Sequence, residues 1–545
     1  MRADGKSEGL RQSMSWLHTW SGLLLGWLLY AVFFTGTLSY FLDEVNLWMK
    51  PELHRSVPDA GTAARAVAAM QELAPRAAAW TIALPNERQA AVEVSWREPG
   101  AAAGRAGLRR AELDAGTGEV LQPRQTRGGA FLYRFHFELH AMPRLWARWI
   151  VGVATMLMFV AILSGVVTHK KIFADFFTFR PGKGQRSWLD AHNATAVLAL
   201  PFHLMITFSG LLLLMYMLMP WGIQAGYQGD MQAYAAERRA AGMGGGGGGG
   251  APPREAARTE REAAAPLAPV APMLAEAGRR WPGRSVGTIV VNRPGTDRAT
   301  VELREHGGRS LVDRGASRRL LFDGMTGELR DAPALPAPSA ASATYNVLTS
   351  AHLGRFAGPA LRWLLFLSGM AGTAMAATGL VLWVVKRLPE RRKLGRTPFG
   401  HRLVEVLNVG AVAGLSLATA GYFWLNRLLP AGLAQRADWE VQGFFALWAA
   451  SLLHAALRPH RRAWLEQMAA AAAGFALLPL LNPLTGGHGL FASVALGQWP
   501  IAGFDLAMLS LALLHGFVAW RLLARPAAPV PARGRLAGAT PGARP

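Results

Sequence analysis

Histidines recur at matching positions along this chain, and they are the residues whose type and spacing suggest chemistry. His18 precedes Gly36 by eighteen residues, and His192 precedes Gly210 by the same number. Two facing imidazoles are suitable axial ligands for a low-spin b-type haem, which needs neither cysteine nor a covalent attachment motif. The chain has fourteen histidines and no cysteine, which excludes disulfides, cysteine-ligated iron–sulfur clusters and thiol catalysis. We expect any redox chemistry to use a cofactor held by other side chains.

A second pair of histidines shows the same internal repetition. His140 begins a segment that ends near Gly165, and His352 begins one that ends near Gly379, with an offset of two residues between the copies. His136 lies one helical turn before His140 and is an alternative ligand. The repeat unit is therefore a span, an outer domain and a second span, and it occurs twice.

The direction in which each span crosses the membrane places the four clearest histidines at two depths. His18 and His192 fall at the cytoplasmic ends of their spans and His140 and His352 at the outer ends, so one pair lies near each membrane face. His203 lies eleven residues after His192, about three turns and roughly 16 Å deeper. An ionisable residue at that depth is functional by default, as a haem ligand, in a proton path or as a partner of a haem propionate. We expect two haem b groups, their iron bound by histidines in this order of preference: His18, His192, His140 and His352, then His203, His169 and His136.

Each of these residues also has an ordinary explanation. A single histidine at a helix end is usually an interfacial polar residue, and His169, which closes the second span, competes with the others as a ligand. Arg148 and Arg362 stand at matching span starts, where they either hold haem propionates or extend toward lipid headgroups. Asp190 beside His192 either orients that imidazole or caps the third span. A non-haem metal site is less favoured because carboxylates are scarce within the spans.

Apolar stretches dominate the chain. About half of the 545 residues are hydrophobic, and they are gathered in segments long enough to cross a hydrocarbon core of roughly 30 Å. Such segments must be helices, because a lone strand leaves its backbone polar groups unsatisfied in lipid. The first is too long for a cleavable signal peptide and lacks a small-residue cleavage site, so we expect an anchor. The sequence predicts eight spans, at about 16–42, 146–168, 191–219, 361–385, 404–428, 441–457, 463–481 and 502–523.

Basic residues set the expected orientation. The formal net charge is +22, and lysines and arginines gather in the loops 169–190 and 386–403, at 458–462 and in the C-terminal tail. By the positive-inside rule these segments face the cytoplasm, which puts both termini inside and the two long polar segments outside. Nucleic-acid binding is not expected, because the basic residues flank spans and do not line one soluble face.

The two polar segments predict a pair of outer α+β domains. Residues 80–96 and 286–303 each form two short strands joined by a turn, preceded by an alanine-rich helix and followed by a strand pair with a D-x-x-T-G-E turn. The expected fold is a polytopic α-helical membrane protein with an internally duplicated four-helix core. Its expected divisions are the N-terminus and first span (1–42), the first outer domain (43–143), the second and third spans (144–219), the second outer domain with a glycine-rich linker (220–355), the fourth span (356–390), a C-terminal four-helix extension (391–525) and a tail (526–545).

Several segments together resemble a known family. The segments MSWLHTWSGLLLGW, FHFELH, SGVVTHKKIF, WLDAHNATAVLALPFHLMITFSGL and SAHLGRF are similar to PepSY-associated transmembrane proteins of Gram-negative inner membranes, above all the ferric-siderophore reductase type (FoxB- and PiuB-like). The resemblance covers roughly residues 10–390, and the last four spans resemble an accessory extension of some members. It implies PepSY-like periplasmic domains, haem b bound by span histidines, and reduction of a ferric siderophore. The residues that match the histidine motifs are His18, His136, His140, His169, His192, His203 and His352.

The leading hypothesis is therefore a di-haem enzyme of the bacterial inner membrane that carries electrons across the bilayer and reduces periplasmic ferric siderophores for iron uptake. Its electron donor, a quinol or a flavin reductase, is not encoded here, since the chain has no dinucleotide fingerprint in a usable context. Two other hypotheses compete with it. One is a non-redox transport or accessory protein for siderophores or metals. The other is a structural or regulatory protein whose outer domains bind a periplasmic partner.

Overall fold

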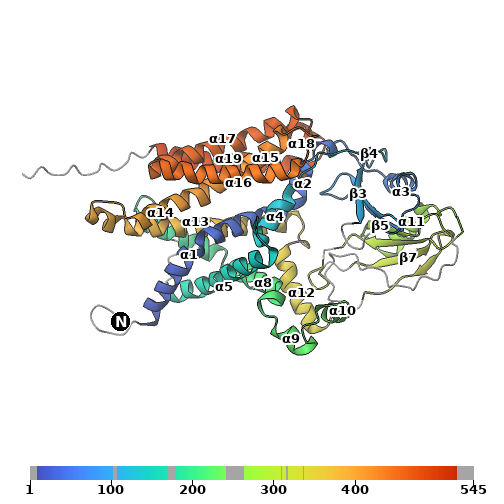
Figure 1. Ribbon diagram of the computed structural model, residues 1–545, viewed down its shortest axis with the longest axis horizontal. Helices are drawn as coiled ribbons and strands as arrows, with labels where there is room; N and C mark the ends of the chain where they lie inside the picture. The colour runs from blue at the N-terminus through green and yellow to red at the C-terminus, as the bar shows by residue number, and fades with distance from the viewer. Residues whose placement is uncertain are drawn as a thin grey trace, which may run out of the picture.

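The computed structural model describes residues 9–101, 107–169, 178–240, 263–307, 310–314, 317–335 and 337–524, together with residues 173 and 176. Long helices lie side by side, and a β-sheet with its own helices lies at one end of them (Figure 1). We call this the sheet end of the bundle and the opposite end the far end. The predicted glycine-rich linker at 244–250 and the tail at 526–545 lie outside the described residues.

Within the described residues, eight helical segments are long and apolar enough to cross a membrane, which confirms the predicted number. Many of their large apolar side chains, such as Leu24, Leu198 and Leu513, are exposed, as expected for a surface that meets lipid. The protein is thus a multi-pass membrane protein. The segments are Leu10–Trp48 (α1 Leu10–Leu38, η1 Ser39–Phe41 and α2 Leu42–Trp48), Arg144–Thr168 (α5), Leu200–Leu218 (α8), Pro359–Leu394 (α13), Phe399–Leu428 (α14 Phe399–Val409, η3 Gly410–Gly414 and α15 Leu415–Leu428), Arg436–Leu457 (α16), His460–Leu484 (α17) and Trp499–Ala524 (α19).

The third predicted span is two helices and not one. Helix α7 (Gln185–Leu198) ends before Ala199, whose backbone is not helical, and α8 begins at Leu200. Pro201 explains the break, because it has no N–H to donate to the preceding turn and its ring crowds that turn. The prediction of one continuous helix over 191–219 was therefore wrong, and of the two helices α8 alone is long and apolar enough to cross a membrane.

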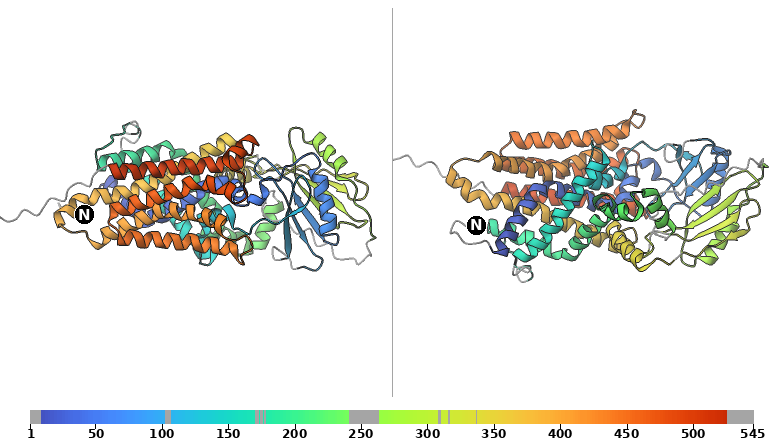
Figure 2. Two further views of the ribbon diagram at one scale, coloured as in Figure 1. Left: turned by 90° about the horizontal axis from the view of Figure 1, so that it is seen from above. Right: turned by 60° about the horizontal axis from the view of Figure 1, so that its bottom comes forward.

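The duplicated core contains α1, α5, the α7–α8 pair and α13. Helix α1 packs on α5 and α13, α7 packs on α13, and α5 packs on α8, so the helices form the predicted four-part bundle. Two shorter helices, α4 (Gly128–Glu138) and α12 (Ala340–Leu353), precede α5 and α13 and pack on α1 and α8 respectively. The two further views show the sheet again at one end of the helices (Figure 2).

The two predicted outer domains share a single sheet. Its eight strands run in the order β4-β3-β2-β1-β5-β6-β7-β8, all antiparallel, and the two halves join where β1 pairs with β5. Helices α3 (Thr62–Leu73) and α11 (Val270–Arg280) pack together, and one hydrophobic core contains residues of both halves. The two predicted α+β units are thus present, and they share one continuous sheet and one core. The strands are β1 Ala79–Ala83, β2 Val92–Arg97, β3 Leu108–Leu113, β4 Val120–Leu121, β5 Val286–Asn292, β6 Thr300–Glu305, β7 Arg319–Asp323 and β8 Leu329–Asp331.

The D-x-x-T-G-E turns form as predicted in both halves. In the first, Asp114 Oδ1 accepts hydrogen bonds from the backbone N–H groups of Gly116 and Thr117, at 2.9 and 2.8 Å. The chain then reverses through Gly118, whose φ of +81° favours glycine because it has no Cβ. Asp323 makes the equivalent turn in the second half.

The C-terminal helices cover one side of the duplicated core, as a layer at the top of Figure 1. Tyr30, Ala31 and Phe34 of α1 lie in the same hydrophobic core as residues of α15, α16, α17 and α19. Trp27 donates to Asn408 at 2.8 Å, and Asn408 donates to the Leu380 carbonyl at 3.0 Å, so α14 is joined to both α1 and α13. The extension is thus built into the core and is not a separate bundle.

Candidate functional site: two pairs of histidines

One pair of histidines lies toward the far end of the core. The ring centroids of His18 on α1 and His192 on α7 are 6.2 Å apart, and the ring planes meet at 70°. His18 Nδ1 lies 2.8 Å from the carbonyl oxygen of Ala161, and His192 Nδ1 lies 2.9 Å from that of Met375. Each ring is therefore held by the neighbouring span, α5 for His18 and α13 for His192. The structure brings together the two residues predicted to pair at this level.

A second pair lies toward the sheet end, with His136 in the place predicted for His140. His136 stands on the last turn of α4 and His352 on the last turn of α12, and their ring centroids are 6.1 Å apart. His136 Nδ1 lies 2.7 Å from the carbonyl oxygen of Val32. His352 Nδ1 lies 3.0 Å from Ser209 Oγ. The arrangement repeats that of the first pair.

The chemistry of the four rings suits a metal placed between them. Because Nδ1 carries the hydrogen that its oxygen partner accepts, the lone pair of Nε2 is left to bind a metal, and the partner fixes the ring's orientation. A metal–imidazole bond is about 2 Å long, so two such bonds in line, with a ring radius at each end, put the centroids roughly 6 Å apart. Both observed spacings match this value. These residues therefore fit bis-histidine ligation, which suits a low-spin b-type haem.

Glycines allow the helices of the first repeat to approach these rings. A Cβ added at Gly165 on α5 would lie 3.1 Å from His18 Cε1. One added at Gly36 on α1 would lie 2.6 Å from His136 Cε1 and Nδ1. Each histidine of the first repeat thus packs against a glycine on the opposite span of the same repeat.

The second repeat has the same reciprocal contacts. A Cβ at Gly379 on α13 would lie 3.1 Å from His192 Cε1, and one at Gly210 on α8 would lie 3.2 Å from His352 Cε1. The glycines recognised in the sequence as repeat markers are therefore the surfaces against which the paired rings are packed.

His140 is not part of either pair. It follows the end of α4, between Leu139 and Ala141, whose φ values of +52° and +60° turn the chain away from the helix. Its ring stacks on Phe445, with centroids 4.7 Å apart and planes at 14°. The prediction that His140 faces His352 is corrected, because the turn after α4 carries it toward the C-terminal extension.

The two remaining candidates lie apart from the pairs. His169 Nε2 lies 2.8 Å from the side-chain nitrogen of Asn193, at the end of α5. His203 is 1% exposed, its ring lies against Phe33 with centroids 5.9 Å apart, and Gly372 faces its Nε2. Neither ring nitrogen of His203 has a hydrogen bond of standard geometry within the described part of the chain, although backbone groups of Ala196 and Ser368 interact with the ring. It lies between the levels of the two pairs, eleven residues beyond His192.

The charged residues considered as helpers of the site have protein partners. Arg148 pairs with Glu138 at 2.5 Å, and Arg362 pairs with Glu44 at 3.2 Å. Asp190 is buried inside α7 and pairs with Arg180 at 2.8 Å, and these hydrogen bonds lower the pKa of its carboxyl. It therefore neither caps the helix nor orients His192, whose Nδ1 partner is the Met375 carbonyl.

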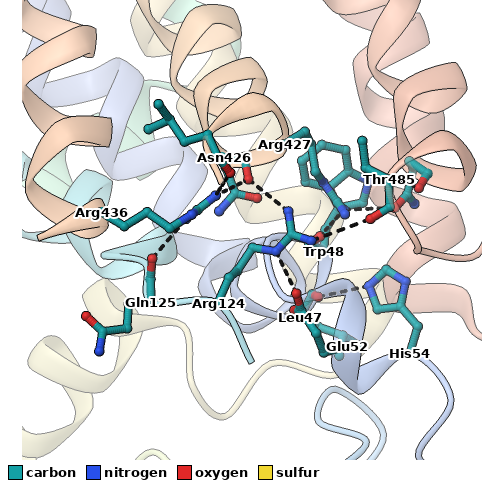
Figure 3. Close-up of polar contacts among 12 residues, drawn as sticks. Leu47, Trp48, Glu52, His54, Arg124, Gln125, Asn426, Arg427, Arg436 and Thr485 are labelled. Atoms are coloured by element: carbon teal, nitrogen blue, oxygen red, sulfur yellow. Dashed lines mark hydrogen bonds and ion pairs between the residues drawn. The ribbon is translucent and has the colours of Figure 1, made fainter. Parts of the chain in front are cut away.

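A cluster of buried arginines lies at the sheet end where the extension meets the first repeat, and the sequence reasoning missed it. Figure 3 shows Arg124, Arg427 and Arg436 turned toward backbone carbonyls and polar side chains of both parts. Arg427 also lies over the Trp48 ring, 4.1 Å from its centroid. Arg436 is fully buried and pairs with Glu440. The sequence signal that could have indicated this cluster is the presence of ionisable residues at the ends of predicted apolar spans.

His54 lies beside this cluster and is held neutral. Its Nε2 donates to the Leu47 carbonyl at 3.0 Å, and its Nδ1 accepts from the His488 backbone N–H at 3.1 Å. Burial, together with the positive charge of Arg427, lowers the pKa of His54 to about 3. The imidazole therefore acts here as a structural hydrogen-bonding group.

Comparison with known proteins agrees with this organisation. No curated protein matches the chain. The family described as the PepSY-associated TM region matches residues 15–386, which include both histidine pairs and the joined sheet. The match ends before the C-terminal helices begin at Phe399. Since it covers more than half of the sequence, this chain belongs to the family of PepSY-associated transmembrane proteins.

Proposed function

We propose that this protein is a haem-b-containing electron-transfer protein that carries electrons across the bacterial inner membrane and reduces ferric siderophores on the periplasmic side. One observation carries the proposal. Two pairs of imidazoles face each other at a spacing that fits an iron between them, and each Nδ1 is already bound to an oxygen. A structural role does not need two such pairs at two levels of one bundle.

His18 and His192 would hold one haem, and His136 and His352 the other. Haem supplies one-electron redox chemistry when it is bound. The carbonyls of Ala161, Val32 and Met375, and Ser209 Oγ, fix the tautomer of each ring so that every Nε2 is directed as an acceptor. Gly36 and Gly210, which face the rings of the second pair, lie eighteen residues beyond His18 and His192. At 1.5 Å per residue the two levels are separated by roughly 27 Å, close to the thickness of a hydrocarbon core.

The proposed orientation follows from charge. The last turn of α13 at the far end carries Arg391, Arg392 and Lys393, and the sheet lies at the opposite end. The positive-inside rule then puts the far end and both termini in the cytoplasm and the sheet in the periplasm. An unidentified donor, a quinol or a flavin reductase, would deliver electrons to the site formed by His18 and His192 at the cytoplasmic end.

The reaction itself is a one-electron reduction of iron. The donor is oxidised, one electron passes to the chelated Fe(III), and Fe(II) results without a covalent bond to the protein. Oxygen donors of a siderophore hold the smaller, more highly charged Fe(III) much more tightly than Fe(II). Reduction therefore loosens the chelate and makes the iron available for uptake.

Absorption spectroscopy of purified full-length protein tests the proposal. Protein produced in haem-replete cells should show a b-type spectrum that changes on dithionite reduction, with two haems per chain. His136→Ala and His352→Ala should each remove one haem, and His18→Ala and His192→Ala the other. The matched control is His140→Ala, which should retain both. Colourless full-length protein would refute the proposal.

A separate measurement tests electron transfer from the protein to a ferric siderophore. Dithionite-reduced protein, freed of excess reductant, should be reoxidised by a ferric siderophore, and a ferrous-iron chelator should capture the product. If siderophore-dependent iron uptake survives in His136→Ala cells, the protein is instead a non-redox accessory of uptake.

A further inference from the structure

A cleft opens at the sheet end between the first repeat and the C-terminal extension. Its volume is about 530 Å³, within the range of small-molecule sites. One wall is the segment between β4 and α4, and the other is the beginning of α16. The lining residues on which the argument depends are Lys50, Arg124, Gln125, Arg127, Gln435 and Asp438.

The lining is polar and rich in cations. Its basic residues are Lys50, Arg124 and Arg127, and Asp438 is the one acidic residue among the lining residues described. Lys50 pairs with Glu112 and Arg124 with Glu52, so Arg127 carries the positive charge that a ligand can reach. Arg127 pairs with Asp438 at 2.6 Å, and these side chains are 55% and 47% exposed. A pair this exposed contributes little to stability, so a ligand carboxylate can replace Asp438 on Arg127 at little cost. Arg127 is therefore the residue through which the cleft can bind an anionic group.

The walls of the cleft are fixed in place before any ligand arrives. Arg124 is nearly buried and binds Glu52 at 2.8 Å and the Asn426 carbonyl at 3.0 Å. The fully buried Arg436 donates to the Gln125 carbonyl at 2.9 Å (Figure 3). The segment that precedes α4 is thus tied to α15 and α16, and a ligand would not have to order it on binding.

The same segment leads directly to the histidine pair at the sheet end. His136 stands on α4 nine residues after Arg127, which is about 14 Å along the helix axis. Between them, the ring of Phe131 lies 5.2 Å from that of Tyr422 and 6.0 Å from that of Phe135. Aromatic side chains thus fill the space from the cleft to His136, over a distance that electrons cross by tunnelling through protein.

We propose that this cleft binds an anionic ferric chelate with carboxylate oxygens, and that the C-terminal extension supplies one wall of the site. The inference rests on the proposed function and names its substrate class and place. An electron supplied by the quinol or flavin-reductase donor would reduce the bound Fe(III) to Fe(II). Gln435, Ala437 and Asp438 lie outside the matched region of the family, so the extension makes the site particular to chains that have it.

Binding of gallium(III) citrate to the purified full-length protein tests the inference, since gallium copies ferric iron but is not reduced. Arg127→Gln should weaken binding about tenfold, the value of one charge-assisted hydrogen bond. Asp438→Asn should strengthen it several-fold, because it removes the competing carboxylate. Arg279→Gln is the matched control, an exposed arginine paired with Glu276 on α11 at the same end of the protein.

Equilibrium dialysis at low and high salt gives the affinities, and binding to wild-type protein should weaken as salt rises. Unchanged affinity in both cleft variants would overturn the inference, and so would tighter binding of a cationic gallium trihydroxamate. The haem spectrum of each sample separates this result from the proposed function. Protein that contains haem but does not bind gallium citrate would refute only the proposed substrate site. Colourless protein that binds gallium citrate would refute only the proposed electron-transfer function.

Discussion

Alanine at Gly36 should remove one haem and leave the other. A Cβ at this position would lie 2.6 Å from His136 Nδ1 and Cε1. Relaxed carbon contacts are about 3.5 Å, so the ring would have to move by about 1 Å. Its Nδ1 bond to the Val32 carbonyl, at 2.7 Å, would be lost with that movement. Overpacking of this size costs about 1–3 kcal/mol, which corresponds to a loss of about 5- to 150-fold in haem affinity.

The other glycines of the pairs provide a graded comparison. A Cβ at Gly379 would lie 3.1 Å from His192, so that ring would need to move by only about 0.4 Å. Gly379→Ala should therefore lower haem affinity less than tenfold. Gly22 is the matched control on α1, because a Cβ there meets nothing within 4 Å. Gly22→Ala adds the same methyl group to the same helix and should retain both haems.

The assay is a titration of haem-free protein with haemin, followed by the reduced-minus-oxidised spectrum and the haem content per chain. Wild type and Gly22→Ala should reach two haems, and Gly36→Ala should stop near one at concentrations that saturate wild type. The reasoning would be refuted if Gly36→Ala bound two haems with wild-type affinity. A larger loss in Gly379→Ala than in Gly36→Ala would refute it equally.

Three further outcomes are expected. His203→Leu should retain both haems, because His203 belongs to neither histidine pair; a missing haem would contradict this. Arg436→Met should destabilise the protein by about 3–5 kcal/mol in thermal unfolding, because Glu440 is left buried without its cation, and Arg436→Met with Glu440→Leu should recover most of the loss. His54 has a pKa of about 3 because burial and Arg427 disfavour its charged form, whereas the unfolded chain takes up that proton near pH 6.5. Stability should therefore fall below pH 6.5 by up to about 1.4 kcal/mol per pH unit, and His54→Gln should flatten that slope; parallel slopes in the two proteins would contradict it.

Local patterns in the sequence predicted most of the elements correctly. The number of spans, the four strand pairs and the two D-x-x-T-G-E turns all depend on residues close together in the chain. The break at Pro201 was also a local signal, and it was passed over because the hydropathy continues through it. Spans, strands and turns can be predicted from the sequence because each depends on a local property: the length of an apolar stretch, the alternation of apolar and polar residues, or the restricted backbone of Gly and Pro.

The choice between His136 and His140 was open in the sequence for a numerical reason. His352 precedes Gly379 by 27 residues, whereas His136 and His140 precede Gly165 by 29 and 25. The two candidates therefore differ from the second repeat by the same amount. The structure decides between them through the left-handed backbone at Leu139 and Ala141, which no spacing argument reveals.

What the sequence by itself determined is a duplicated membrane protein with a histidine near each end of each repeat, because hydropathy and repetition are properties of the chain alone. Only the tertiary structure decided that β1 pairs with β5 to join the two halves, that His136 faces His352, and that the extension shares a core with α1. Each of these contacts links residues at least 200 positions apart in the chain. Their geometry depends on how whole helices and strands pack, and packing is decided by shape complementarity between surfaces that the sequence does not place side by side.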